Sequence, residues 1–386
     1  MSDNKNGQVR QSNIELLRIV SMCMIIAMHY MTKGMELPKL SADSSLHNIV
    51  FRLIFAFCAS SVNAYVLISG YFAIDSKWHI GKVIYLWAEV LFYSILIPVI
   101  LNIFGVADIG SMELSVKQQI FLPISYEHYW FATAYVMLYL FSPVLSSAIK
   151  NLDKKQLGTV IAALVTVFCG FKSVNPYLIP WDKYGDDVIW FMILYLIAGY
   201  MRQYGVPFIT KNSDVKRMPN DADSAAASGC ADISGRDTTV SGRRGLCVYI
   251  IFSILTFLIA YAASYIVRAT GKLEYYMDMT LCYNYITVLI ASIGLFCAFN
   301  SMKLRSSRFI NRIAGYTFGV YLLHENITLR TLWPKLLGID RVNGQWYQVL
   351  HMLLCIVIVF IAGMVSDAVR SGLFGLILSK CKKRDV

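Results

Sequence analysis

The sequence predicts an all-α, polytopic integral membrane protein with about ten transmembrane helices, and three observations support this fold class. Hydrophobic residues make up 57% of the 386 residues and only 15% are charged, whereas about a quarter of a soluble chain is charged. The mean hydropathy is +0.54. Apolar stretches of about 20 residues, the length that spans a bilayer core, recur along the chain between short polar segments.

The predicted helices follow one another along the whole chain. The first apolar run begins at Ile14. Because many others follow it, we expect a first membrane helix rather than a cleaved signal peptide. A polar, proline-containing segment at residues 172–187 separates the fifth and sixth helices. In chain order, we expect transmembrane helices at about residues 14–34, 49–73, 80–104, 127–149, 156–172, 188–203, 246–268, 280–300, 312–332 and 347–377.

Charges in the loops predict the orientation. If the N-terminus is cytoplasmic, most of the 35 Lys and Arg residues fall on the inner side, as the positive-inside rule requires. Both termini are then cytoplasmic, which needs an even number of spans, as ten is. We therefore expect a multi-pass protein of the plasma membrane. The same loop charges explain the net charge of +11 without a nucleic-acid partner.

The chain is expected to form a single transmembrane domain covering residues 1–386, with one long cytoplasmic loop at about residues 204–245. This loop is rich in Ser, Ala, Gly and Asp and has no apolar period, so we expect it to be disordered. The nine cysteines are scattered and none forms a CxxC pair. The sequence therefore indicates neither a metal site nor a disulfide framework.

The first helix carries ionisable residues, which usually face a cavity, a partner or a substrate path when they lie inside a membrane. Arg18 and His29 are eleven residues apart. At 3.6 residues per turn both project from one face, about 16 Å apart along the axis. Glu15 lies three residues before Arg18 and can pair with it. Either the stripe lines a path for an anionic cytosolic substrate, or Arg18 reaches the interface and His29 bonds a neighbouring helix. This helix alone leaves both interpretations open.

Polar residues in later helices also have two interpretations each. His324 lies beside Glu325, and its imidazole can orient His29 or bind an acceptor hydroxyl, or it can serve helix packing. Glu89 is expected to pair with an Arg or His of another helix, with proton handling as the second interpretation. Ser69 lies in no GxSxG motif, so a helix cap or an intramembrane hydrogen bond is expected there.

Four motifs together resemble acyltransferase family 3, the membrane-bound acyltransferases of bacterial surface polysaccharides. The first is Arg, ten residues and then His in the first helix. LISGYF at residues 67–72 resembles the family's Ser-Gly-aromatic motif. The segment YWFATAYVMLYLFSPVL at residues 129–145 is similar to the family's pattern of Trp-Phe, Tyr and a late Pro. The segment GYTFGVYLLHEN at residues 315–326 resembles the family's penultimate-helix motif, which ends in Tyr-Leu-x-His. The four occur in the family's order over nearly the whole membrane region.

The resemblance implies an enzyme that moves an acyl group, acetyl in the simplest case, from an acyl-coenzyme A to a hydroxyl of a cell-surface polysaccharide or lipid-linked glycan precursor. His29 would be the base or a transient acyl carrier, Arg18 would bind donor phosphates, and Glu15 would hold Arg18. The donor is a substrate, and no permanently bound cofactor is expected. The motifs also imply substrate contacts at Ser69, Trp130, Tyr321 and His324, although a tryptophan near an outer boundary is also a common membrane anchor.

Two features depart from the family pattern. Many members carry an arginine cluster after the second helix, where this chain has Lys77, His79 and Lys82. Some members also carry an extracytoplasmic esterase-like domain, whereas this chain ends soon after the last predicted helix, so we expect the reaction to belong to the membrane domain or a partner. The alternative function is a transporter or flippase of a lipid-linked sugar. Paired Gly/Pro-broken helices of the inverted-repeat type, which would favour it, are not evident.

Overall fold

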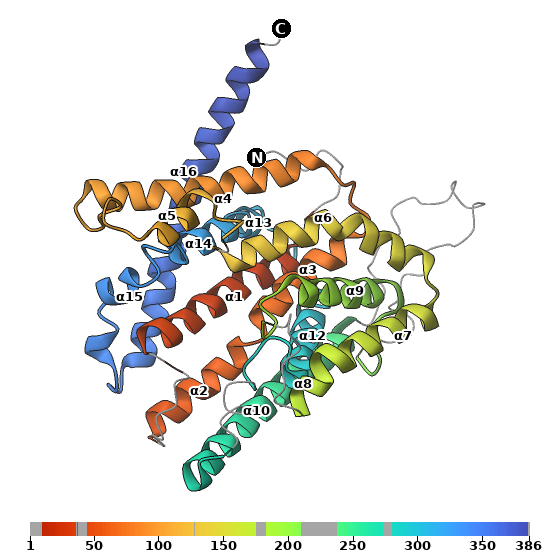
Figure 1. The fold of residues 1–386 in the computed structure, drawn as a ribbon. Helices are drawn as coiled ribbons and strands as arrows, with labels where there is room; N and C mark the ends of the chain where they lie inside the picture. Colours follow the sequence, from red (N-terminus) through yellow and green to blue (C-terminus); the bar gives the residue numbers. More distant parts are fainter. Residues whose placement is uncertain are drawn as a thin grey trace. The chain divides into compact units, whose positions relative to one another are not determined.

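The computed structural model describes residues 10–35, 37, 45–126, 128–174, 183–209, 238–272 and 280–384, and all regular secondary structure in these ranges is helical (Figure 1). The predicted all-α fold class is therefore confirmed. Within these ranges, seven helices are long and apolar enough to cross a membrane: Ser12–Gly34, Leu46–Ala73, Ile80–Ile103, Trp130–Asn151, Lys154–Val174, Ser241–Thr270 and Gln348–Leu376. Two further apolar helices, Val188–Tyr204 and Ile286–Asn300, are shorter.

These helices coincide with predicted spans, while the count of ten and the cytoplasmic termini remain predictions. Of the loop expected at residues 204–245, residues 210–237 lie outside the described part of the chain. Helix α10 (Thr238–Thr270) begins before the predicted end of that loop. The chain divides into two compact units, residues 1–58, 79–136 and 306–386 in the first and residues 59–78 and 137–305 in the second.

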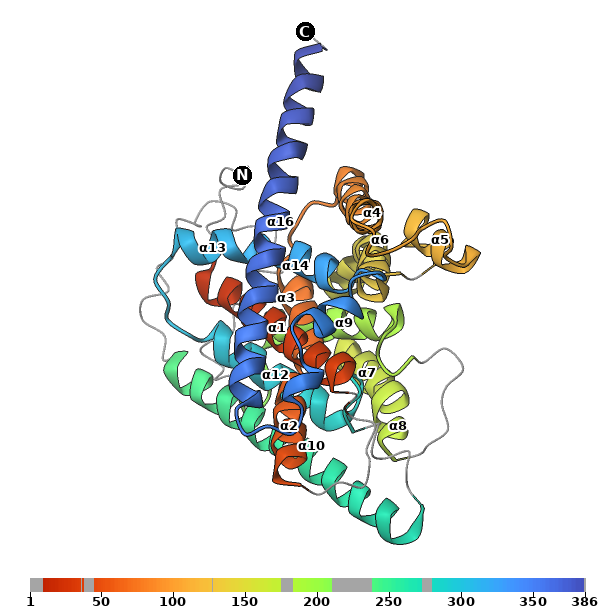
Figure 2. The ribbon, with the colours of Figure 1, turned by 90° about the vertical axis from the view of Figure 1, so that its left-hand side faces the viewer.

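The first unit is built around α14 (Thr317–His324), which contacts α1 (Ser12–His29), α4 (Ile80–Ile103) and α16 (Gln348–Arg384); α14 and α16 are seen together in Figures 1 and 2. Glycines allow this close approach. A Cβ added to Gly363 of α16 would lie only 2.5 Å from the Cα of Val320, and one added to Gly319 of α14 would meet Asp367. The first unit also contains α2 (Leu46–Cys58), α5 (Leu114–Phe121), the start of α6 (Trp130–Asn151), α13 (Arg308–Ala314) and α15 (Leu332–Leu336).

The span predicted at residues 312–332 is not one continuous helix, because α13, α14 and α15 replace it. At its end, α14 gives way to a turn that a buried asparagine stabilises. The Oδ1 of Asn326 accepts hydrogen bonds from the backbone N–H of Thr328, at 3.1 Å, and from its hydroxyl, at 2.7 Å. Such side-chain bonds to the nearby backbone compete with helical hydrogen bonds, so the helix ends beside His324.

The second unit packs α3 (Ser61–Ala73) against α9 (Val188–Tyr204) and α12 (Ile286–Asn300), and α10 against α12. It also contains α7 (Lys154–Val165), which continues through a π-helical turn (Thr166–Gly170) into α8 (Phe171–Val174). Gly245 of α10 faces Gly294 of α12, and a Cβ on Gly245 would lie 2.8 Å from the carbonyl oxygen of Gly294. Small residues of this kind let membrane helices approach closely.

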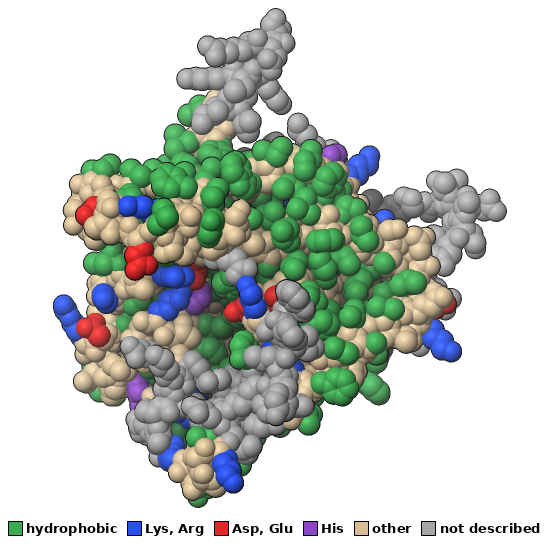
Figure 3. Space-filling model, viewed as in Figure 1, with side chains coloured by type: hydrophobic (Ala, Val, Ile, Leu, Met, Phe, Trp, Pro, Cys, Tyr) green, Lys and Arg blue, Asp and Glu red, His purple; other side chains and the backbone are tan. Residues whose placement is uncertain are grey.

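Outward-facing side chains on the helices are mainly apolar, as Figure 3 shows for the face of the molecule that includes α4. On α4, Ile84 is 60% exposed and Ile103 is 72% exposed. A soluble protein rarely leaves large contiguous apolar surfaces uncovered, whereas helices in a bilayer expose such side chains to lipid. The surface therefore agrees with a multi-pass membrane protein.

Candidate active site

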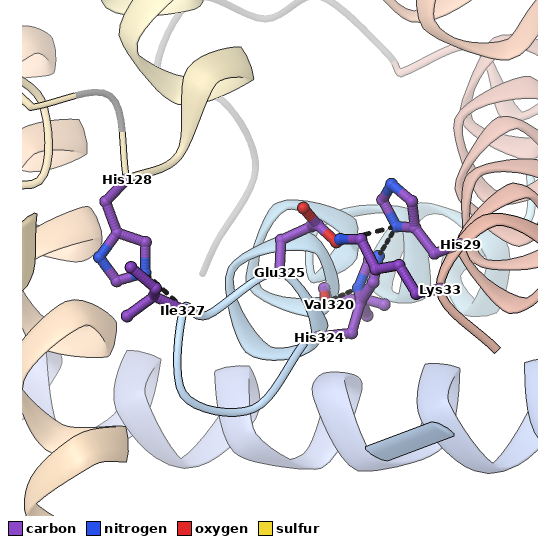
Figure 4. Close-up of polar contacts among 7 residues, drawn as sticks. All are labelled: His29, Lys33, His128, Val320, His324, Glu325 and Ile327. Carbon is purple, nitrogen blue, oxygen red and sulfur yellow. Dashed lines mark hydrogen bonds and ion pairs between the residues drawn. The ribbon is translucent and has the colours of Figure 1, made fainter. Parts of the chain in front are cut away.

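The site is centred on two histidines that the sequence places 295 residues apart. His29 is the last residue of α1 and His324 is the last residue of α14. The Nδ1 of His29 lies 3.0 Å from the Nε2 of His324, and their ring centroids are 5.1 Å apart. Figure 4 shows the two imidazoles facing each other. The prediction left open whether these residues meet, and the structure brings them together.

The hydrogen bonds assign the protons on both neutral rings. The Nδ1 of His324 lies 2.6 Å from the backbone carbonyl oxygen of Val320. Because a carbonyl can only accept, this nitrogen carries the proton and the Nε2 of His324 is an acceptor. The Nδ1 of His29 must then donate to it. The Nε2 of His29 is left with a free lone pair, and in Figure 4 it points away from His324.

A carboxylate and an ammonium group complete the cluster. Glu325 follows His324 directly, and its Oε1 lies 3.2 Å from the Nδ1 of His29. Lys33 forms an ion pair with the same Oε1. The carboxylate is nearly buried, with its side chain 7% exposed, compared with 16% for His29 and 24% for Lys33. Glu325 therefore lies where its negative charge can stabilise an imidazolium at His29.

The end of α1 is held in place next to His29. Residues Tyr30–Gly34 continue α1 as a π-helical turn, a feature that is common at functional sites. The hydroxyl of Tyr30 donates to the Nδ1 of His351, at 2.9 Å, and the Nε2 of His351 donates to the carbonyl of Leu337, at 3.0 Å. The π-helical turn also places Lys33 four residues beyond His29 and against Glu325.

The turn after Glu325 is fixed by a second group of buried side chains. The amide of Asn326 donates to the hydroxyl of Tyr129, at 2.9 Å, and to the carbonyl of Tyr93, at 3.2 Å. Tyr129 in turn donates to the carbonyl of Leu322, at 3.0 Å. These bonds tie both sides of Glu325 to α4 and to the segment before α6, so the carboxylate has a fixed position.

His128 holds the same turn from the other side (Figure 4). Its Nε2 accepts a 2.8 Å hydrogen bond from the backbone N–H of Ile327. Its Nδ1 lies 3.1 Å from the carbonyl of Gln119, to which it donates. Burial lowers the pKa of His128 to about 4. The ring is therefore neutral near pH 7, which the accepted bond from Ile327 requires.

The predicted pair of Glu15 and Arg18 forms at the other end of α1. The Nε of Arg18 lies 3.9 Å from the Oε2 of Glu15, a loose pair of the kind that contributes little stability by itself. Eleven residues of helix separate Arg18 from His29, or about 16 Å along the axis. Arg18 and Glu15 are thus on the same helix as the cluster but do not contact it.

The remaining predicted residues have different positions. Tyr321 is buried and sets its ring edge-on to His324, with centroids 6.2 Å apart. Trp130 begins α6 and packs edge-on against Phe131. Ser69, in the second unit, donates to the carbonyl of Tyr65, at 3.2 Å, the intrahelical bond expected of a membrane serine. Tyr321 is therefore next to the cluster.

The cluster also contains a possible metal-ligand set. One ligand atom each from His29, His324 and Glu325 lie within 4.8 Å of one another, and two histidines with a glutamate can bind zinc. However, the ammonium group of Lys33 already neutralises the carboxylate of Glu325 through an ion pair with its Oε1. The 3.0 Å separation of the imidazole nitrogens is also that of a hydrogen bond. We therefore interpret the cluster as a hydrogen-bonded network.

Sequence reasoning missed the roles of Lys33 and Glu325. Lys33 follows His29 by four residues, a helical spacing that puts two side chains on one face, and Glu325 is adjacent to His324. Both spacings can be read directly from the sequence. The expected pairing of Glu89 is confirmed, because its Oε1 lies 3.0 Å from the Nη2 of Arg370 on α16.

Ionisable residues within a bundle of membrane helices mark a functional site. The family model described as the acyltransferase domain matches residues 11–366, nearly the whole chain. The chain belongs to this family, acyltransferase family 3, and the resemblance inferred from its four motifs is confirmed. No match was found among curated proteins or among solved structures. The protein is therefore a multi-pass membrane acyltransferase.

Proposed function

We propose that the protein transfers an acyl group, acetyl in the simplest case, from an acyl-coenzyme A to a hydroxyl of a cell-surface polysaccharide or lipid-linked glycan precursor at the plasma membrane. The family membership supports acyl transfer. A hydroxyl acceptor is supported by the geometry at His29, since a hydroxyl is a poor nucleophile at neutral pH and needs a base close by.

The single observation that carries this proposal is the orientation of His29. Its Nδ1–H donates to the Nε2 of His324, at 3.0 Å, and the Oε1 of Glu325 lies 3.2 Å from the same nitrogen as the counter-charge of an imidazolium. Its Nε2 is consequently free to accept a proton. A hydrogen bond at the far nitrogen fixes the tautomer and the orientation of a histidine base, and a nearby carboxylate stabilises its imidazolium.

The reaction then balances without another reactant. The Nε2 of His29 takes the hydroxyl proton while the acceptor oxygen attacks the thioester carbonyl carbon. The tetrahedral intermediate loses coenzyme A as the C–S bond breaks, and the imidazolium returns the proton to the departing thiolate. The products are an ester and a free thiol. During the step Glu325 stabilises the positive charge on His29, and Lys33 keeps Glu325 ionised by pairing with it.

Arg18 supplies a separate function at the opposite end of α1. A guanidinium group binds phosphate in a fixed, two-point geometry, so Arg18 is suited to the phosphates of the donor. Glu15, 3.9 Å away, limits the orientations of its side chain. The distance of about 16 Å between Arg18 and His29 allows an extended donor to reach from one to the other. A route in which His29 first carries the acyl group places the same demands on both residues.

The test is acyl transfer by the purified protein in detergent, measured as release of the coenzyme A thiol from acetyl-coenzyme A with and without a crude surface-glycan extract. We expect His29→Ala to lower the rate by at least about 100-fold, because general base catalysis contributes that much. Arg18→Lys should raise the KM for the donor. The matched control is His47→Ala, since His47 lies on α2 and sets its ring at a tilt against that of Phe51, with centroids 4.8 Å apart.

Equal turnover by the wild type and His29→Ala would remove His29 from the mechanism. No turnover with any acyl donor or extract, from protein shown to be folded, would favour the transporter or flippase. Loss of His29→Ala protein from the membrane would mean that the histidine pair is a packing element rather than a catalytic one.

A further inference from the structure

A second group of buried ionisable residues lies between α4 and α16, and the mechanism above does not use it. Glu89 is 5% exposed, Asp367 is 1% exposed and Arg370 is 3% exposed. All three lie within membrane-spanning helices, where an uncompensated charge is costly. Their arrangement therefore has to be close to electrically neutral.

Each of the three nitrogens of the Arg370 side chain has its own partner. The Nε donates to the Oδ1 of Asp367, at 2.7 Å, and the Nη1 donates to the hydroxyl of Tyr85, at 3.0 Å. The Nη2 lies 3.0 Å from the Oε1 of Glu89. One guanidinium group thus serves two carboxyl groups.

The charge balance requires one proton on this carboxyl pair. Two carboxylates and one guanidinium would leave one net negative charge buried in the membrane. The Oδ1 of Asp367 accepts from both Arg370 and the hydroxyl of Tyr93, at 3.1 Å. Two donors stabilise the ionised form of Asp367. Glu89 is therefore the member that carries the proton, which it can donate to Asp367.

The same residues support the helix that carries His324. Gly319 of α14 lies directly against Asp367, so that a side chain there would collide with the carboxyl group. The next residue, Val320, provides the carbonyl that fixes the proton on His324. Tyr93 donates its hydroxyl to Asp367, while its backbone carbonyl accepts from the amide of Asn326. Asp367 therefore contacts the start of α14 at Gly319 and is connected to the turn after α14 through Tyr93 and Asn326.

We propose that Glu89 and Asp367 share one proton, and that the neutral network of Glu89, Asp367 and Arg370 is a positioning unit that holds His324 and Glu325 against His29. Its effect on catalysis rests on the proposed function, whereas the shared proton does not. Two charged or titratable groups of α16 face Glu89, namely Asp367 and Arg370. The hydroxyl groups of Tyr85 and Tyr93, both on α4, belong to the same network.

Removing the proton of the Glu89–Asp367 pair at high pH would leave a net negative charge next to α14, where Asp367 contacts Gly319. We therefore expect acyl transfer by the wild type to decline reversibly as the pH rises. Glu89→Gln should abolish this decline, because an amide is neutral at every pH. It should retain acyl transfer at neutral pH to within about threefold, since the amide can donate to Asp367 and accept from Arg370 as a protonated carboxyl does.

The experiment is infrared difference spectroscopy across an alkaline pH change, together with the pH profile of acyl transfer. We expect a carbonyl stretch of a protonated carboxyl group that disappears at high pH, is missing in Glu89→Gln and persists in the control Glu113→Gln. Glu113 is an exposed carboxylate just before α5.

The absence of this band in the wild type would overturn the proposal, whatever the activity. Inactive or unfolded Glu89→Gln protein would also overturn it, because that result indicates an ionised Glu89 that Arg370 requires. If the band is present and acyl transfer is absent from every variant, the shared proton stands and the proposed function fails.

Discussion

At the scale of single residues, the main finding is that His29 is held by a carboxylate and a neutral imidazole on the same nitrogen. The carboxylate, 3.2 Å from that nitrogen, is placed to stabilise an imidazolium at His29 in the proposed reaction. Lys33 moderates this effect by pairing with Glu325. The cluster thus combines a base with a counter-charge in a site that is largely buried.

The prediction at this scale concerns the carboxylate. Glu325→Gln keeps the size of the side chain but removes its charge, so the imidazolium at His29 loses its stabilising partner. We expect kcat to fall by about 100-fold or more, with little change in the KM for the donor, because Arg18 and not Glu325 is assigned to donor binding. Steady-state kinetics with acetyl-coenzyme A measures both.

Glu325→Asp is the matched variant, since it keeps the charge and shortens the reach by one methylene. Partial recovery of kcat relative to Glu325→Gln would support an electrostatic role. Equal kcat values for the wild type and Glu325→Gln would contradict the role of Glu325.

The sequence was sufficient for part of this site and not for the rest. The helical spacing from Arg18 to His29 and from Glu15 to Arg18 follows from local periodicity, and the Glu15–Arg18 pair formed as expected. The contact between Lys33 and Glu325 joins residues 292 positions apart. No local period can predict such a contact, because it depends on how α14 packs against α1.

At the scale of elements, the short helix α14 is what assembles the site. The sequence predicts the long apolar helices well, since each is set by the thickness of the bilayer. It does not predict that residues 312–332 break into shorter helices, because the break depends on tertiary partners of Asn326 such as Tyr93 and Tyr129. The break places His324 and Glu325 at a helix end, where the backbone can turn toward His29.

The contact between α14 and α16 gives the second prediction. Gly363→Ala would place a methyl group 2.5 Å from the Cα of Val320, and backbone cannot yield as a flexible side chain can. We expect α14 to shift away from α16, with a loss of stability of about 1–3 kcal/mol from overpacking and a lower rate of acyl transfer. Thermal unfolding in detergent and thiol release measure the two effects.

Gly372→Ala on the same helix is the control, because nothing lies within 4 Å of its added methyl group. It should leave both measurements close to those of the wild type. A Gly363→Ala protein as stable and active as the Gly372→Ala protein would mean that the close contact of α14 with α16 is not required.

At the scale of the whole molecule, the orientation in the membrane decides which substrate meets which end of α1. The excess of Lys and Arg in alternate loops predicts a cytoplasmic N-terminus. Arg18 then lies near the inner end of the Ser12–Gly34 span, while His29 is only five residues from its outer end. A donor from the cytoplasm would bind at Arg18 and extend outward, so that its thioester reaches His29 in the outer half of the bilayer.

The last prediction tests this orientation with introduced cysteines. Ser76, between α3 and α4, is predicted to be cytoplasmic, and Ser111, between α4 and α5, extracytoplasmic; both are exposed in the structure. In intact cells, a membrane-impermeant maleimide should label Ser111→Cys above the background of the native cysteines and should label Ser76→Cys only after lysis. The opposite pattern would invert the protein and place His29 near the cytoplasm, so that donor and acceptor would have to meet on the inner side. Labelling of both variants in intact cells would mean that α4 does not cross the membrane.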